Sequence, residues 1–188
     1  MGNNGMKLRS IFLAVTVGMI YGTGIIADDS GPAPAVKRIG TYDSRSVAIA
    51  FVGSEVYKKT AGEELRKNWA AYKKAKEAGN TEEEKKLKAW GENQQHLLHQ
   101  QAFSTAPVDN ILKHIADKLP EFKKQQKVDL LVSKWDKKTL DKYKSAQQQD
   151  VTLPLIELFN PNAKQKKTAL EIRKHKPYPI KMIKKGMD

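Results

Sequence analysis

Three residues on one predicted helix could bind a metal ion. His96 and His99 are three positions apart, and Glu92 lies one turn before His96, so two imidazoles and a carboxylate share a helical stretch. The surrounding sequence is rich in Gln and offers no second ligand cluster. We therefore interpret these side chains as solvated positions on a polar face, and the sequence predicts no metal and no other cofactor.

A second group of titratable residues, Asp109, His114 and Asp117, could support acid–base chemistry. Their helical neighbours are Lys113 and Lys118, which favours surface ion pairs. The chain has no cysteine, no Gly-rich phosphate loop and no Ser in a nucleophile elbow. The sequence therefore predicts no catalytic residues, and we expect a protein that is not an enzyme.

The positive charge is concentrated at the C-terminal end. The formal net charge is +13, and residues 161–188 hold nine Lys and Arg against Glu171 and Asp188. Pro177 and Pro179 prevent a continuous helix, so the sequence predicts a basic, disordered tail over 161–188. Such a tail could adhere to anionic lipid headgroups, through Lys166, Lys167, Arg173, Lys174, Lys181, Lys184 and Lys185. Aromatic residues are only 7% of the chain, so a base-stacking platform is not expected. The positive charge alone would allow binding to nucleic acid, but the export predicted below argues against such a partner.

The first 27 residues are typical of an export signal. Lys7 and Arg9 precede an apolar run over 11–20, and the small Ala27 fits the last position before a cleavage site. An uncleaved membrane anchor is the alternative, but the run is shorter than the roughly 20 apolar residues that span a bilayer. We expect cleavage after Ala27, a linker over 28–36 and a soluble periplasmic product.

The middle of the chain predicts two helices that fold back on each other. Ala61, Leu65, Trp69 and Tyr72 form a narrow apolar stripe, and Leu87, Trp90 and Leu97 form another after the turn. Trp69 and Trp90 are equally far from position 79.5, which predicts that they touch across an antiparallel pair. These residues either hold the arm together or present apolar surface to a client; the two are compatible, and the candidate set is Trp69, Tyr72, Leu87, Trp90 and Leu97.

The turn between these helices has its own signals. Gly79 or Asn80 suits a helix C-terminus, and Thr81 with Glu84 predicts a capping box for the second helix. The sequence thus predicts an arm over 61–106, whose outgoing helix of 18 residues extends about 27 Å at 1.5 Å per residue.

The segments on either side of the arm, 37–60 and 107–160, are predicted to form one small body. Residues 38–42 and 128–132 are typical of strands, and we expect Ile39 and Leu130 to lie in one sheet. Asp43 is a predicted helix N-cap, and Pro120 a helix kink or end. Residues 137–149 hold either a third strand or a loop, and a short helix follows over 155–159. The predicted fold class is α+β.

Three passages resemble the Skp/OmpH family of periplasmic chaperones. Lys37–Val47 is similar to the opening strand and its Gly-x-x-Asp step into a helix, Lys127–Lys134 to the strand after the arm, and Asp150–Asn160 to the closing Asp-Val-Thr helix. The resemblance spans roughly 37–160. It implies a homotrimer with a β-barrel-like hub and helical arms around a cavity, which binds unfolded outer-membrane or envelope proteins without chemistry. This chain's arms are short for the family, and its basic tail is additional.

Two functions of different classes follow. The first is a non-enzymatic periplasmic holdase, which keeps the strand edges of unfolded clients apart. The second is a basic structural protein that tethers the envelope through its cationic tail.

Overall fold

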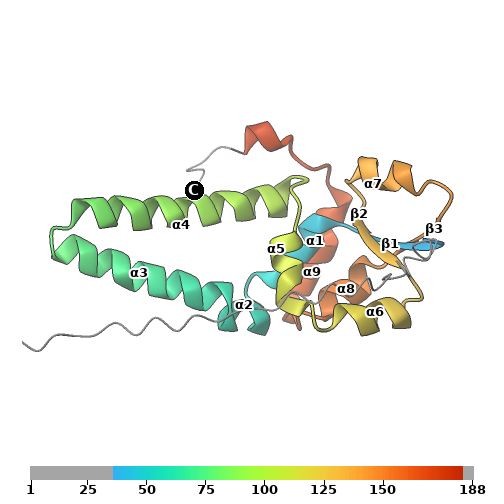
Figure 1. Ribbon diagram of the computed structural model, residues 1–188, viewed down its shortest axis with the longest axis horizontal. Coiled ribbons are helices and arrows are strands. Elements are labelled where there is room, and N and C mark those ends of the chain that lie inside the picture. The colour runs from blue at the N-terminus through green and yellow to red at the C-terminus, as the bar shows by residue number, and fades with distance from the viewer. Residues whose placement is uncertain (1–35, 184–188) are drawn as a thin grey trace, which may run out of the picture. The chain divides into compact units, whose positions relative to one another are not determined.

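The structure, a computed structural model, describes residues 36–183, and a three-stranded parallel sheet lies at the end of this part that is opposite the turn between its two long helices (Figure 1). The strands are β1 (Arg38–Tyr42), β2 (Leu130–Ser133) and β3 (Gln147–Asp150), in the order β2-β1-β3. Ile39 pairs with Leu130, as predicted. The fold is a mixture of helices with a small sheet and is loosely α+β. The predicted export signal and its cleavage site lie outside the described residues.

The helices occupy most of the described chain. They are α1 (Ser44–Phe51), α2 (Glu55–Lys59), α3 (Ala61–Glu77), α4 (Thr81–Phe103), α5 (Asp109–Leu112), α6 (Leu119–Gln125), α7 (Lys137–Lys142), α8 (Thr152–Glu157) and α9 (Ala163–Glu171), with short 3-10 turns at Lys113–Ile115, Ile172–Lys174 and Ile180–Met182. No helix between residues 36 and 183 is long and apolar enough to cross a membrane.

Apolar residues are buried in two clusters. The larger one joins α1, α5, α6 and α8 through residues such as Val47, Ile111, Phe122 and Ile156. The smaller one is built on Ile39, Val132 and Ala146, with Leu140 and Tyr143 from the α7 segment packed against it. Each cluster joins residues from both segments that flank the arm, because neither segment alone has enough apolar surface to form a core.

Residues 137–149, for which the sequence allowed a strand or a loop, contain the helix α7 and most of the strand β3. α7 is capped by Asp136, whose carboxylate accepts a hydrogen bond from the backbone N–H of Thr139 at 3.1 Å. β3 follows with the sequence Gln-Gln-Gln-Asp, and all four of its residues are exposed. It joins β1 through backbone pairing and one hydrogen bond from Thr41 Oγ1 to the carbonyl of Gln149 at 3.3 Å. The strand carries no alternation of apolar and polar residues that would have predicted it.

The sequence predicted that Pro120 kinks or ends a helix, but Pro120 lies in the first turn of α6. Proline is tolerated there because the first N–H groups of a helix have no partner within it. The apolar residues before it form α5 and a 3-10 turn instead of one continuous helix.

The predicted disorder of the C-terminal tail is wrong for residues 163–183. α9 packs beside α1, with Ala169 fully buried (Figure 1). Ser46 Oγ donates to the carbonyl of Ala169 at 2.6 Å, and Gln165 Nε2 donates to that of Val52 at 2.6 Å. A basic helix with few apolar residues is held in this way by a small contact residue and by side chain–backbone bonds, which composition does not reveal.

α3 and α4 lie side by side, joined by a short turn (Figure 1). Gly79 has φ +67°, and the backbone N–H groups of Gly79 and Asn80 bond the carbonyls of Lys76 and Ala75 at 3.1 and 2.9 Å, which is a Schellman ending. The predicted capping box of Thr81 and Glu84 is wrong, because the N-cap of α4 is Asn80. Its side chain accepts from the N–H of Glu83 at 3.2 Å.

Two glycines of this pair give a matched test of the turn. We expect Gly79→Ala to destabilise the protein by about 1 kcal/mol, because a Cβ is strained at positive φ although open space surrounds it. Gly91→Ala should instead stabilise by up to about 1 kcal/mol, since it lies inside α4 and its Cβ would meet only Asn68 Oδ1 at 3.8 Å. Urea unfolding of both variants checks this, and equal effects would contradict it.

Candidate functional site

An apolar cleft of about 440 Å³ lies between α3 and α4 and the adjoining part of the body. The five candidate residues of the arm all line it: Trp69, Tyr72, Leu87, Trp90 and Leu97. Its size and its mostly apolar lining are those of a ligand site. The structure therefore places the residues of both predicted stripes around one cleft.

The predicted contact between Trp69 and Trp90 is wrong. Trp69 stacks on Tyr72 of its own helix, with ring centroids 5.2 Å apart and planes 15° apart, and Lys73 Nζ lies 5.5 Å from the Trp69 ring centroid. Trp90 has no ring contact among the described residues. Equal distance from the turn fixes the level of a side chain along the pair but not the direction in which it projects, because each helix turns 100° per residue.

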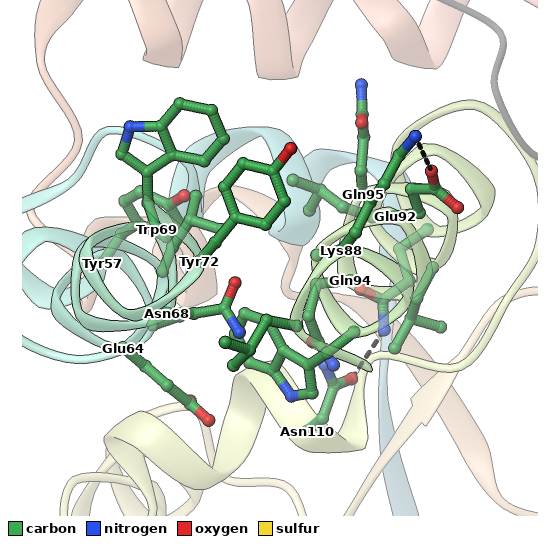
Figure 2. Close-up of a pocket in the computed structure, with 18 of the residues that line it drawn as sticks. Tyr57, Glu64, Asn68, Trp69, Tyr72, Lys88, Glu92, Gln94, Gln95 and Asn110 are labelled. Carbon is green, nitrogen blue, oxygen red and sulfur yellow. Dashed lines mark hydrogen bonds and ion pairs between the residues drawn. The ribbon is translucent and has the colours of Figure 1, made fainter. Parts of the chain in front are cut away.

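Trp69 is therefore accessible to a ligand instead of being sealed inside the pair. Its side chain is 56% exposed, and that of Leu65, one turn earlier, is 41% exposed. Figure 2 shows Trp69 and Tyr72 projecting from α3, while Lys88 and Gln95 project from α4. Large apolar side chains exposed beside a cleft mark a binding surface more often than scattered ones do.

Part of the cleft lining belongs to the body. Phe51, Tyr57 and Ile111 line it, and Phe51 and Ile111 are also members of the main core. The Phe51 ring is 5.3 Å from that of Tyr57 and stacks on His114 at 5.1 Å. The hairpin pattern could not have identified these residues, because they come from α1, α2 and α5.

The polar groups of the cleft are mostly amides. Gln101 Nε2 donates to Asn110 Oδ1 at 2.6 Å and to the carbonyl of Pro107 at 2.7 Å, which ties the end of α4 to α5. Lys88 forms an ion pair with Glu92 at 4.0 Å (Figure 2). Farther along the pair, the Tyr72 hydroxyl donates to Glu84 at 3.4 Å, between α3 and α4.

A buried ionic cluster lies at the carboxyl ends of β1 and β2. Asp43 is the N-cap of α1, as predicted, and it is fully buried. Arg45 donates to it through Nε at 3.1 Å and Nη2 at 2.9 Å, and Lys134 Nζ lies at 2.7 Å. Arg45 and Lys134 also lie over the ring of Trp135 at 5.2 and 4.6 Å. Burial raises the pKa of Asp43, but the hydrogen bonds from Arg45 and Lys134 outweigh it and lower the pKa to about 2.

This cluster is structural in its connections. Arg45 Nη1 donates to the carbonyl of His175 at 2.9 Å. The arginine that pairs with the N-cap of α1 therefore also binds the segment after α9. The backbone N–H of Asp43 donates to Thr152 Oγ1 at 3.0 Å, which adds the start of α8. The sequence identified Asp43 as a cap but not the ionic cluster around it, since Lys134 and Trp135 come from a distant part of the chain and join Asp43 and Arg45 only in the fold.

The tail cations are only partly available for a membrane. Lys166 pairs with Glu157, Arg173 with Asp150, and Lys174 with Glu171. Lys167 and Lys181 are exposed, whereas Lys184 and Lys185 lie outside the described residues. Tyr178 is held to the end of α4, where Ser104 Oγ donates to its carbonyl at 2.7 Å.

The histidines considered as metal ligands occupy one side of α4. His96 Nε2 lies 3.0 Å from the amide nitrogen of Gln100, and the His99 ring is 5.9 Å from that of Phe103. Within residues 36–183 no group of three or more His, Cys, Asp or Glu side chains is arranged to hold a metal ion.

Comparison with known proteins adds no relative: no family model, no curated protein and no solved structure matches the chain.

Proposed function

We propose that this protein is a non-enzymatic chaperone, a Skp-like holdase that binds unfolded envelope or outer-membrane proteins in the periplasm. The observation that carries the proposal is the cleft, which leaves Trp69 and Leu65 exposed beside two helices that extend from the body. A holdase needs apolar surface that is accessible without unfolding. The lining offers this surface and holds no set of residues typical of catalysis.

The resemblance in sequence supports the same proposal. Its three passages coincide with β1 and its step into α1, with β2, and with β3's last residue and α8. The α3–α4 pair lies between the first two passages in the sequence, and by this resemblance we propose that it corresponds to the family's arm. By the same resemblance we propose a homotrimer whose arms surround the client, which a mass measurement in solution tests directly.

Tethering through the tail has less support than the sequence suggested. Three of its candidate cations are paired within the chain, and α9 is packed on α1. Charge reversal at Lys167 and Lys181 is the test of this alternative, because both are exposed and their replacement leaves the packing of α9 intact. A tether would lose binding to anionic vesicles in this variant.

The holdase proposal predicts that a charge at Leu65 weakens suppression of aggregation, whereas a charge at the equally exposed Leu153 does not. Leu65 lines the cleft, whereas Leu153 lies on α8 outside it, and both are 41% exposed. We expect Leu65→Asp to weaken suppression of aggregation about tenfold, because it places a charge where a client's apolar side chain would be buried. Leu153→Asp should behave as wild type. The measurement is light scattering of a urea-unfolded β-barrel membrane protein diluted into each variant, and equal loss in both would refute the site.

A further inference from the structure

Resting on the proposed function, we propose that the cleft between α3 and α4 is a site for one short, extended, uncharged peptide segment with large apolar side chains at alternate positions. The ligand would lie along the pair, with its apolar side chains against Leu65, Trp69 and Leu97, and its backbone beside the amides of the lining. The site would thereby select segments by the alternation of their apolar side chains and not only by their overall hydrophobicity.

The length of the lining sets the length of the ligand. On α3 the lining runs from Ala61 to Tyr72, and on α4 from Leu87 to Gln101. At 1.5 Å per residue these stretches are about 16 and 21 Å long. An extended chain rises about 3.3 Å per residue, so five or six residues fill the cleft. Successive side chains of such a segment point to opposite sides, and only every second one enters.

The polar lining suits a peptide backbone. Asn68 and Gln94 line the cleft, and neither side chain forms a hydrogen bond within the described part of the chain. Asn68 points from α3 toward α4, close to Gly91 (Figure 2). An amide both donates and accepts, which matches the alternating N–H and C=O groups of an extended chain.

The charges of the lining favour a neutral ligand. Lys88 is the only cation among the described lining residues, and Glu92 lies 4.0 Å from it. Glu64 is the remaining charged residue of the lining. The lining residues thus carry one more carboxylate than cations, which disfavours a fatty acid or another anionic amphiphile relative to a neutral peptide.

The test is calorimetric titration of the full chain with blocked hexapeptides of one composition. The alternating peptide Phe-Ser-Leu-Thr-Phe-Ser should bind at least about tenfold more tightly than its isomer Phe-Leu-Phe-Ser-Thr-Ser, in which the apolar residues are consecutive. Leu65→Asp should lose binding by a similar factor, and Leu153→Asp should not. Gln94→Leu should weaken binding of the alternating peptide, because it removes an amide while keeping a side chain of comparable size.

Several outcomes would overturn the inference. These are equal affinity for the two isomers, no binding of either, displacement of the peptide by palmitate at lower concentration, or a homo-oligomer that Leu65→Asp converts to monomer. The last two results would assign the cleft to a lipid or to a second copy of the chain. A protein that suppresses aggregation without binding hexapeptides would refute this inference alone. One that binds hexapeptides but leaves aggregation unchanged would refute the holdase proposal alone.

Discussion

Asp43→Asn should reduce the free energy of unfolding by about 3 kcal/mol or more, the usual cost of breaking a buried ion pair by removing one partner. Asn retains the capping geometry and the size of Asp, so the loss reports the charge. Arg45, which is 1% exposed, would be left buried without its carboxylate, because Arg cannot release its proton. Lys134 is partly exposed and could turn to solvent, so the penalty comes mainly from Arg45.

Asp136→Asn is the matched control, because Asp136 is also an N-cap but lies exposed at the start of α7. We expect its effect to stay within about 0.5 kcal/mol. Denaturant unfolding of the three proteins at neutral pH makes the comparison. Similar losses for the two substitutions would mean that the buried cluster contributes no more than an ordinary cap.

The same residue predicts a loss of stability in acid. Its pKa is lowered from 3.8 to about 2 in the folded protein, so the folded state favours the ionised carboxylate. The stabilisation is therefore fully present above about pH 4, and it is lost as the pH falls through the folded pKa near 2. The shift corresponds to about 2 kcal/mol. Asp43→Asn should lack this part of the acid dependence, which a comparison of unfolding curves between pH 5 and 2 measures.

Local signals in the sequence predicted the local features of the fold. Asp43 follows a strand and precedes a helical repeat, and it is the cap of α1. Ile39 and Leu130 lie in short apolar runs, and they are paired in the sheet. Both predictions depend on neighbouring residues, whose effect on the backbone does not require knowledge of the rest of the chain.

The cleft could be predicted only in part, because it depends on how two helices are rotated about their axes. The apolar stripes identified Trp69 and Trp90, but the stacking of Trp69 on Tyr72 and its exposure are set by packing. Phe51 and Tyr57 reach the cleft because α1 packs against α4 and α2 against α3, and the packing of α1 on α4 is a contact between distant elements that no local pattern encodes.

The prediction of a disordered C-terminal tail was wrong for a related reason. Composition treats α9 as a charged segment with few apolar residues, which is typical of disorder. What holds it is one buried alanine, Ala169, and hydrogen bonds from Ser46 and Gln165 to backbone carbonyls. Small residues allow two helices to approach closely, yet they have low hydrophobicity. The sequence of α9 therefore shows no apolar pattern strong enough to predict that it packs on α1.

Ending the chain at Asn160 should therefore abolish cooperative folding, although the deleted part was predicted to be a disordered tail. The deletion removes the carbonyl of His175 from buried Arg45 and the carbonyl of Ala169 from buried Ser46. A hydrogen bond to a charged group contributes about 1.5–3 kcal/mol, and an unsatisfied buried group costs about 1–3 kcal/mol. Exposure of the apolar surface of α1 adds to this. The sum approaches the entire stability of a small domain, about 5–15 kcal/mol.

The control is a chain that ends at Ile183, which lacks only residues 184–188 and with them Lys184 and Lys185. It should keep the thermal midpoint of the full protein, whereas the chain ending at Asn160 should show no sharp transition by near-ultraviolet circular dichroism. Ile183 is itself buried, so the boundary between the two outcomes lies within residues 161–183. An unchanged midpoint after deletion to Asn160 would show that the packing of α9 contributes nothing. It would also restore the tail to the role of a separate, charged appendage.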